Sequence, residues 1–256
     1  MTRQSVGMHD VSPANEATIS SYDALTDDFL SAWDPEGDAG RRLLLNPTFF
    51  RLLGDLTGRR VLDAGCGQGY LSRLLANRGA EVVGVEPAAR LVIYARRVEQ
   101  ERRQGVRYLQ RDLSRLGDAG RPFDAVVANM VLLDIADWQS ALANCVAALK
   151  PGGLLVYSLH HPCWVAGAAE EWPQRKKVEL CEYLDEYEVR GGVGGSVNYH
   201  RPLSSYVNET IRLGCRIVEI AEPRLLPEQI EDPSQEILTH IPNYIVVSAR
   251  RAPSDA

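Results

Sequence analysis

Val61-Leu62-Asp63-Ala64-Gly65-Cys66-Gly67-Gln68-Gly69 is the stretch of this sequence that decides its fold. An apolar strand, closed by the acidic side chain of Asp63, passes into a turn in which every second residue is glycine. Glycine permits the positive φ angles that so tight a turn needs, and it lets a ligand approach bare main chain. A helix is predicted from residue 70, so the N–H groups at its start can face a polar ligand. The stretch therefore predicts a strand, a turn and a helix that bind a ligand together.

The segments after this turn repeat the same alternation of strand and helix. Strands are predicted for short runs rich in Val, Leu and Ile, at 59–63, 81–86, 106–110, 123–128 and 154–159. Helices are predicted between them, at 70–78, 88–103 and 137–149. Strands that are apolar almost throughout are typical of a parallel sheet with helices on both faces. Two later runs, 215–220 and 243–249, bring the expected sheet to seven strands, and a helix is expected over 202–213.

The residues before the first strand are predicted to be helical. A polar helical stretch covers residues 12–32, and Asp34-Pro35-Glu36-Gly37-Asp38 breaks it. A second helix starts at Asn46-Pro47 and is expected to end at Gly58. We predict that residues 1–46 form a helical lid.

Residues 160–200 interrupt the alternation. They are rich in aromatic and charged side chains and contain Gly191-Gly192-Val193-Gly194-Gly195. We predict an insertion after the fifth strand, with a small antiparallel flap formed by 177–190 and 196–200. The main domain is then expected to span 47–256 and to carry this insertion as a substrate cap.

Composition limits the classes of function. The chain has 256 residues, 45% of them hydrophobic, and a formal net charge of −6. That balance argues against a nucleic-acid partner, which usually leaves a basic footprint. No apolar run approaches the ~20 residues of a membrane span, the first residues lack the apolar core of a signal peptide, and the five cysteines are scattered without a C-x-x-C pair. We therefore expect a cytoplasmic protein with reduced thiols and no membrane partner.

The glycine turn resembles the nucleotide-binding motif of the class I S-adenosylmethionine (SAM) methyltransferases. Its pattern is D-x-G-x-G-x-G, whereas dinucleotide sites usually read G-x-G-x-x-G. The resemblance covers residues 59–160 well and the last two strands loosely. It implies an α/β, doubly wound, mostly parallel seven-stranded sheet whose last strand is antiparallel, and the short apolar run 244–249 fits that strand.

The resemblance also implies which residues bind SAM. Glu86 ends the second strand, where the family's acid accepts the ribose hydroxyls. Asp112 follows the third strand and would accept the adenine amino group, while Leu113 packs on the ring. Strand-end acids are also often solvated or cap a helix, which is the structural alternative for each of them. The expected cofactor-binding residues are Tyr22, Asp63, Ala64, Gly65, Cys66, Gly67, Gly69, Glu86, Pro87, Asp112, Leu113, Asn129 and Met130.

The expected acceptor is a small molecule. The Asn/Asp-Pro-Pro-Tyr/Phe motif of amino-methylating nucleic-acid enzymes is absent after the fourth strand, where the chain reads Asn129-Met130-Val131-Leu132. Aromatic rings with polar tips suit a partly apolar pocket, although they equally suit the core of an insertion. The candidate substrate-binding residues are Trp33, His160, Trp164 and Tyr199.

Two histidines and a tyrosine are the catalytic candidates. In the family the SAM methyl is attacked in line, so alignment is the main task, and a base helps where the acceptor must lose a proton. His161 follows the fifth strand, His200 lies on the flap side, and Tyr22 belongs to a segment resembling the one that folds over the methionine of SAM. A hydrogen-bonded loop histidine is an equal alternative for both histidines. His160, His161 and Cys163 form only a weak zinc pattern, so no metal is predicted.

The sequence therefore predicts a SAM-dependent methyltransferase that acts on a small, aromatic or partly apolar metabolite. Whether oxygen, nitrogen or carbon is methylated stays open, as does the choice between monomer and homodimer. One alternative is a SAM-binding sensor or partner protein without catalysis. A second is an NAD(P)-dependent oxidoreductase, which would need a different glycine turn and a hydride-transfer group such as Tyr-x-x-x-Lys; Tyr94 has Val98 four residues on.

Overall fold

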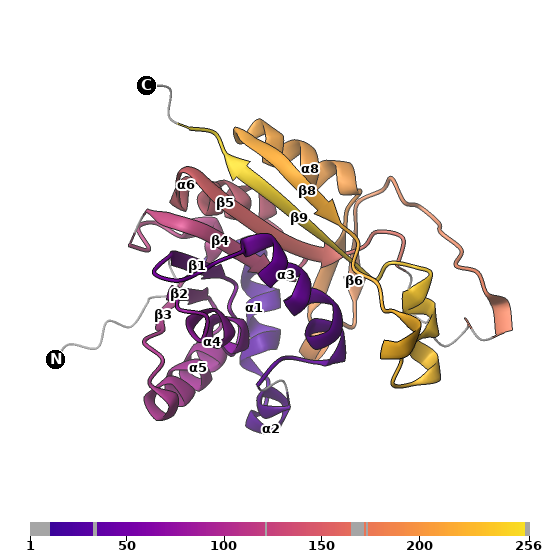
Figure 1. Cartoon of the computed structure of the whole chain (residues 1–256), viewed down its shortest axis with the longest axis horizontal. Coiled ribbons are helices and arrows are strands. Elements are labelled where there is room, and N and C mark those ends of the chain that lie inside the picture. Colours follow the sequence, from indigo (N-terminus) through magenta and orange to yellow (C-terminus); the bar gives the residue numbers. More distant parts are fainter. Residues whose placement is uncertain (1–10, 33–34, 121, 165–171, 173, 254–256) are drawn as a thin grey trace.

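A seven-stranded sheet occupies the centre of the molecule (Figure 1). The computed structural model describes residues 11–32, 35–120, 122–164, 172 and 174–253. The strands are β1 (Arg60–Ala64), β2 (Glu81–Glu86), β3 (Arg107–Gln110), β4 (Phe123–Asn129), β5 (Leu149–His160), β8 (Cys215–Ala221) and β9 (Tyr244–Arg251). Their order is β3-β2-β1-β4-β5-β9-β8; the first five are parallel, and β9 is antiparallel to both neighbours. The predicted doubly wound sheet with an antiparallel last strand is confirmed.

Helices cover both faces of this sheet. They are α3 (Asn46–Leu53), α4 (Tyr70–Ala76), α5 (Ala89–Arg102), α6 (Trp138–Ala148) and α8 (Leu203–Arg212). Residues of α3, α4 and α5 share one core with Val61 and Val127, whereas α6 and α8 share the other with Leu62 and Val126. Adjacent residues of a strand point to opposite faces, so each central strand supplies both cores. This is why these strands read as continuous apolar runs.

The N-terminal segment folds as three short helical pieces, not as the single stretch that was expected. They are a 3₁₀ turn (Pro13–Asn15), α1 (Glu16–Asp23) and α2 (Asp27–Ser31). The break occurs because Thr26 starts a new helix, its hydroxyl accepting a hydrogen bond from the Phe29 N–H. Leu25 and Leu30 then pack on α5, in a cluster with Leu91.

Helix α3 begins where it was predicted to begin but ends earlier. A π-helical turn (Arg41–Leu45) leads into it, and Gly54 ends it with a φ of 67°. The expectation that Gly58 ends this helix was wrong. Gly58 instead donates its N–H to the Gly79 carbonyl and so joins the approach to β1 to the end of α4.

The predicted insertion lies after β5 and contains the expected antiparallel flap. Its strands are β6 (Tyr187–Arg190) and β7 (Val197–His200), so the first strand is shorter than predicted. Two unpredicted 3₁₀ helices, Pro227–Gln229 and Pro233–Thr239, lie between β8 and β9. Within the described residues, every helix is too short or too polar to span a bilayer.

Candidate functional site

A cavity opens at the carboxyl ends of β1 to β4, the edge where open α/β sheets bind ligands. Helix α1 lies over it, because Thr18, Ile19 and Tyr22 line the same cavity. The predicted site residues in the lining are Tyr22, Gly65, Cys66, Gly67, Glu86, Pro87, Asp112, Leu113, Asn129, Met130 and His160. The structure thus brings together side chains that are far apart in the sequence.

The three glycines of the turn all have positive φ, but different atoms surround them. A Cβ at Gly65 would lie 2.2 Å from Cγ2 of Val131, and one at Gly69 would lie 2.5 Å from the Tyr108 hydroxyl. A Cβ at Gly67, where φ is +56°, would meet no atom within 4 Å. Gly65 is therefore needed for packing, whereas Gly67 faces the open cavity.

Glu86 holds this turn and faces the cavity. Its Oε2 accepts a hydrogen bond from the Gly67 N–H at 3.1 Å, and its Oε1 accepts one from the Ala88 N–H at 2.9 Å. Burial raises the pKa of the Glu86 carboxyl to about 7, and the two N–H donors oppose that rise. Each oxygen keeps a lone pair with which it can accept a ligand's hydroxyl hydrogen.

Asp112 ties the N-terminal segment to the sheet edge. Its carboxylate accepts hydrogen bonds from the Ser12 N–H at 2.8 Å, from the Asn15 amide at 3.0 Å and from the Ser114 N–H at 2.8 Å. The side chain is only 3% exposed, so a ligand would reach it past Asn15. Asn15 is a cavity residue that sequence reasoning missed, because nothing in a polar N-terminal helix marks one asparagine.

Asp63 lies behind the turn, not in the cavity lining. It is buried and accepts a hydrogen bond from the Ser72 hydroxyl at 2.6 Å, and burial raises its pKa to about 6. Ala64 and Gly69 likewise do not contribute to the lining among the described residues. These three predicted cofactor residues therefore shape the turn from behind.

The loop after β4 supplies an acid that sequence reasoning did not select. The Asp134 carboxylate lines the cavity, accepts a hydrogen bond from the Tyr22 hydroxyl at 2.6 Å and accepts another from the Asn198 amide. Burial raises the pKa of Asp134 to about 6, while these two donors lower it. A signal was present, because Asp134 is the one charged residue in Val131-Leu132-Leu133-Asp134-Ile135.

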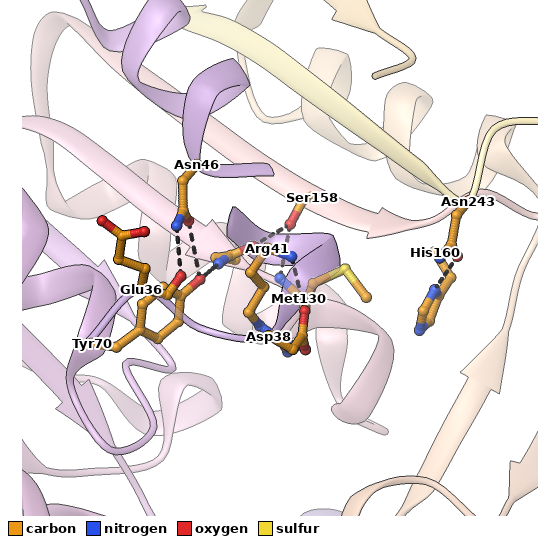
Figure 2. Close-up of polar contacts among 10 residues, drawn as sticks. Glu36, Asp38, Arg41, Asn46, Tyr70, Met130, Ser158, His160 and Asn243 are labelled. Atoms are coloured by element: carbon orange, nitrogen blue, oxygen red, sulfur yellow. Dashed lines mark hydrogen bonds and ion pairs between the residues drawn. The ribbon is translucent and has the colours of Figure 1, made fainter. Parts of the chain in front are cut away.

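Beside β4 and β5 the cavity wall is held by polar contacts (Figure 2). Arg41, from the π-helical turn, lines the cavity and pairs with Asp38. Met130 adopts a φ of 57°, and its N–H donates to the Ser158 hydroxyl at 2.9 Å. Such a backbone angle is costly for a residue with a side chain, which is typical of a site whose surroundings hold it in place.

Gln68 adds an unsatisfied donor to this wall. Its Oε1 accepts the Tyr70 N–H at 2.7 Å, but its Nε2 is buried and has no hydrogen-bond partner in the described structure. Gln68 lines the cavity. Buried donors are normally satisfied, and this one has almost no accessible surface through which a ligand could reach it.

The histidines divide between the cavity and its surroundings. His160 lines the cavity, where its Nδ1 lies 3.2 Å from the Asn243 Oδ1 and burial lowers its pKa. The Nε2 of His161 instead pairs with Glu222 at 3.0 Å. The Nε2 of His200 lies 3.0 Å from the Tyr183 carbonyl, and its ring stacks on another flap residue. Neither of the last two is in the lining among the described residues, and their catalytic role stays a prediction.

The remaining substrate candidates lie elsewhere. Trp164 packs beside Trp172 and Ile237. Tyr199 stacks under the guanidinium of Arg201, 4.6 Å from the ring centre. Trp33 lies outside the described residues. In the part of the chain that the structure describes, no group of three or more His, Cys, Asp or Glu could hold a metal ion.

Comparisons with known proteins agree with this geometry. Residues 61–153 match the family model described as a methyltransferase domain. A ubiquinone biosynthesis O-methyltransferase of Alkalilimnicola ehrlichii is 37% identical over 131 residues, which are 49% of this chain and 53% of that protein. The corresponding protein of a Bradyrhizobium strain is 31% identical over 60% of this chain and 65% of its own. The chain therefore spans about half the length of the first curated relatives that it matches.

Solved structures superpose on most of this chain. A SAM-dependent methyltransferase from Mesorhizobium loti superposes with a TM-score of 0.68 at 27% identity, over 80% of this chain and 96% of that one. A putative enzyme of the same kind from Listeria monocytogenes gives a TM-score of 0.66 over 80% and 95% of the two chains, and at 24% identity it shows the fold alone. Both superpositions therefore support the fold described above.

Proposed function

We propose that this chain, whose residues 61–153 match the family model of a methyltransferase domain, binds SAM and transfers its methyl group to a small, partly apolar metabolite. One observation carries the proposal. Glu86 and the glycine turn face a cavity that α1 covers, and Asp112 and Asn129, from the ends of two other strands, line the same cavity. A turn that only connected a strand to a helix would not need to border such a cavity.

The residues present fit SAM. Glu86 would accept the ribose hydroxyls, Asp112 would accept the adenine amino group together with its present N-terminal donors, and Leu113 would pack on the base. The Arg41 guanidinium would face the carboxylate of the methionine part. SAM supplies an electrophilic methyl group when it is bound. The protein's own contribution is to align the acceptor with that group and to exclude water.

An oxygen atom is the acceptor that the comparisons favour. The curated relatives are O-methyltransferases by name. The cavity wall carries apolar side chains from several elements, among them Ile19, Leu91, Leu133 and Val193. A hydroxyl on a small aromatic ring satisfies both observations, because the ring contacts apolar side chains and the hydroxyl contacts a polar group.

Calorimetry with SAM and with NAD tests the cofactor. We expect SAM to bind and NAD not to bind. Strand β2 has a glutamate at each end, so Glu86→Gln has a matched control in the exposed Glu81→Gln. The first variant should weaken SAM binding by about 1–3 kcal/mol, because ribose hydroxyls lose a charged acceptor in a buried place; the control should bind as wild type does.

The pH dependence of SAM binding gives a second test of the proposal. The ionised Glu86 is the better acceptor and its pKa is raised to about 7, so SAM affinity should increase between about pH 6 and pH 8 and should lose this dependence in Glu86→Gln. Tight NAD binding or wild-type SAM affinity in Glu86→Gln would contradict the proposal. SAM binding without turnover of any acceptor would favour the non-catalytic sensor instead.

A further inference from the structure

We propose that Asp134 binds the acceptor of the methyl group and takes the proton of its hydroxyl. The inference rests on the proposed function and goes beyond it, because it names the residue and the chemical class of acceptor. That class is a neutral aromatic compound with a free hydroxyl.

Asp134 is placed to meet a second ligand. It follows β4 in a short 3₁₀ turn (Leu132–Asp134), and its accessible part faces the cavity. Leu133 and Ile135, its apolar neighbours, line the same cavity. Its polar partners come from outside the segment that matches the family model: Tyr22 belongs to α1 and Asn198 to β7 of the insertion. The segment that matches the family model therefore provides the acid, and segments outside that match surround it.

The partners of Asp134 leave it able to accept a proton. The Tyr22 hydroxyl and the Asn198 amide are neutral donors, one on each carboxylate oxygen, and each oxygen keeps a lone pair. No ion pair found among the described residues includes Asp134. Burial raises the pKa of Asp134 to about 6, so it is ionised at neutral pH and close to the pKa that suits a general base.

The charges of the cavity indicate the class of acceptor. Three carboxyl groups line it, on Glu86, Asp112 and Asp134, and the Arg41 guanidinium in the lining is paired with Asp38. An anionic acceptor would meet like charges in a partly buried place, which is unfavourable. A neutral hydroxyl would donate its hydrogen bond to Asp134, and its ring would lie against Leu133 and Ile135.

The step balances as follows. The acceptor's O–H bond breaks and its proton moves to a carboxylate oxygen of Asp134, the oxygen's electron pair forms the new O–CH3 bond, and the electron pair of the broken S–CH3 bond stays on sulfur. The proton then leaves to solvent when the product departs. Tyr22 and Asn198 hold the carboxylate in place and are positioning residues.

The test uses the whole chain, with catechol as the probe and Asp134→Asn as the variant. Asp124→Asn is the matched control, because that carboxylate lies on β4 at the opposite edge of the sheet, where it pairs with Lys150. Catechol and 1,2-dimethoxybenzene, which lacks hydroxyl hydrogens, are titrated by calorimetry into protein saturated with S-adenosylhomocysteine. Methylation of catechol is followed at saturating SAM between about pH 5 and pH 9.

Wild type and Asp124→Asn should prefer catechol to 1,2-dimethoxybenzene, and Asp134→Asn should lose this preference. Methylation should fall by ~100- to 10,000-fold in Asp134→Asn, as is typical for loss of a base, while SAM affinity stays within about threefold.

In wild type the rate of methylation should fall below about pH 6. Tyr22→Phe should move that limb to higher pH, because it removes a donor that lowers the pKa of Asp134. The other groups that act on this carboxyl electrostatically, Glu86, Arg41 and Tyr206, are unchanged.

Several results would overturn the inference. Methylation by Asp134→Asn within threefold of wild type would leave no base there, and a large loss in His161→Ala or His200→Ala would transfer the role to a histidine. A loss of SAM affinity in Asp134→Asn would assign this acid to the cofactor. If wild type binds SAM but methylates no catechol, the acceptor class is wrong; if it does not bind SAM, the proposed function itself fails. Asp134→Ser serves as the second variant if Asp134→Asn does not fold.

Discussion

Gly65 and Gly67 share a positive φ but differ in what surrounds the absent side chain. An alanine methyl at Gly67 would project into the cavity, whereas one at Gly65 would collide with Val131. Gly67→Ala should therefore cost about 1 kcal/mol of stability through its backbone angle and should also weaken SAM binding by about tenfold. Gly105→Ala is the control, because its φ is +84° and its Cβ would also meet open space, but it lies outside the cavity lining.

Thermal unfolding and SAM titration of these two glycine variants separate the effects. Equal losses of stability with unequal SAM affinity are expected. Equal SAM affinity in both would mean that no ligand approaches the main chain at Gly67. The same comparison made at Gly65 would be ambiguous, since the collision there disturbs the fold itself.

Site residues could be predicted from the sequence where a recognisable strand places them at its end. Glu86 and Asp112 stand at the ends of two strands with clear apolar patterns, and both line the cavity. Asp134 and Asn15 were not selected, because their roles depend on how a turn and a distant helix meet. His160 and His161 illustrate what the sequence could not predict. Adjacent residues of a strand point to opposite faces, and the sequence does not say which of these two histidines faces the cavity.

At the scale of elements, the N-terminal segment acts as a cover held at several points. Asp112 binds Ser12 and Asn15 at its start, and Arg90 of α5 donates to Asp23 and Asp27 near its end. We propose that this cover is the predicted lid, which must open for SAM to enter. The division of this segment into three helical pieces was not predicted. The break at Thr26 depends on a single hydrogen bond from the Phe29 N–H to the Thr26 hydroxyl, which is a weak signal in the sequence.

Asn15→Ala should loosen this lid without unfolding the sheet. The variant loses hydrogen bonds to a buried carboxylate, which are worth about 1.5–3 kcal/mol. We expect faster amide hydrogen exchange in α1 and faster SAM dissociation. Ser21→Ala is the control on the same helix, because the Ser21 hydroxyl donates only to the α1 carbonyls of Ala17 and Thr18 among the described residues. Unchanged exchange in Asn15→Ala would show that the Asn15 side chain does not hold the lid.

At the scale of the molecule, the sheet and the position of the flap were predictable, but the contacts that the flap makes were not. The apolar runs of β1 to β5, together with glycine and proline at their boundaries, predict the strands and a parallel sheet, whereas the antiparallel last strand was implied by the resemblance to methyltransferases. The flap was located correctly by composition, but nothing in residues 160–200 repeats with a period. Which flap residue reaches the cavity therefore depends on the packing of β7 against the turn after β4, where Asn198 meets Asp134.

The concentration of buried acids at one sheet edge should make the stability of the whole molecule depend on pH. Burial raises the pKa of Asp63 and Asp134 to about 6 and that of Glu86 to about 7. A group whose folded pKa exceeds its unfolded value stabilises the fold at pH below the unfolded value, and this contribution is lost as pH rises through the folded pKa. Each group should cost on the order of 3 kcal/mol at pH 8, at about 1.4 kcal/mol per unit of pKa difference. Calorimetric melting of the ligand-free protein should therefore give a higher Tm at pH 5 than at pH 8, and Asp134→Asn should reduce that difference.

Asp124→Asn should leave this difference in Tm intact, because Lys150 lowers the pKa of Asp124 and the contribution of Asp124 to stability changes only at lower pH. A Tm that is constant or falls from pH 8 to pH 5 would show that ionisation of these carboxyls does not destabilise the fold.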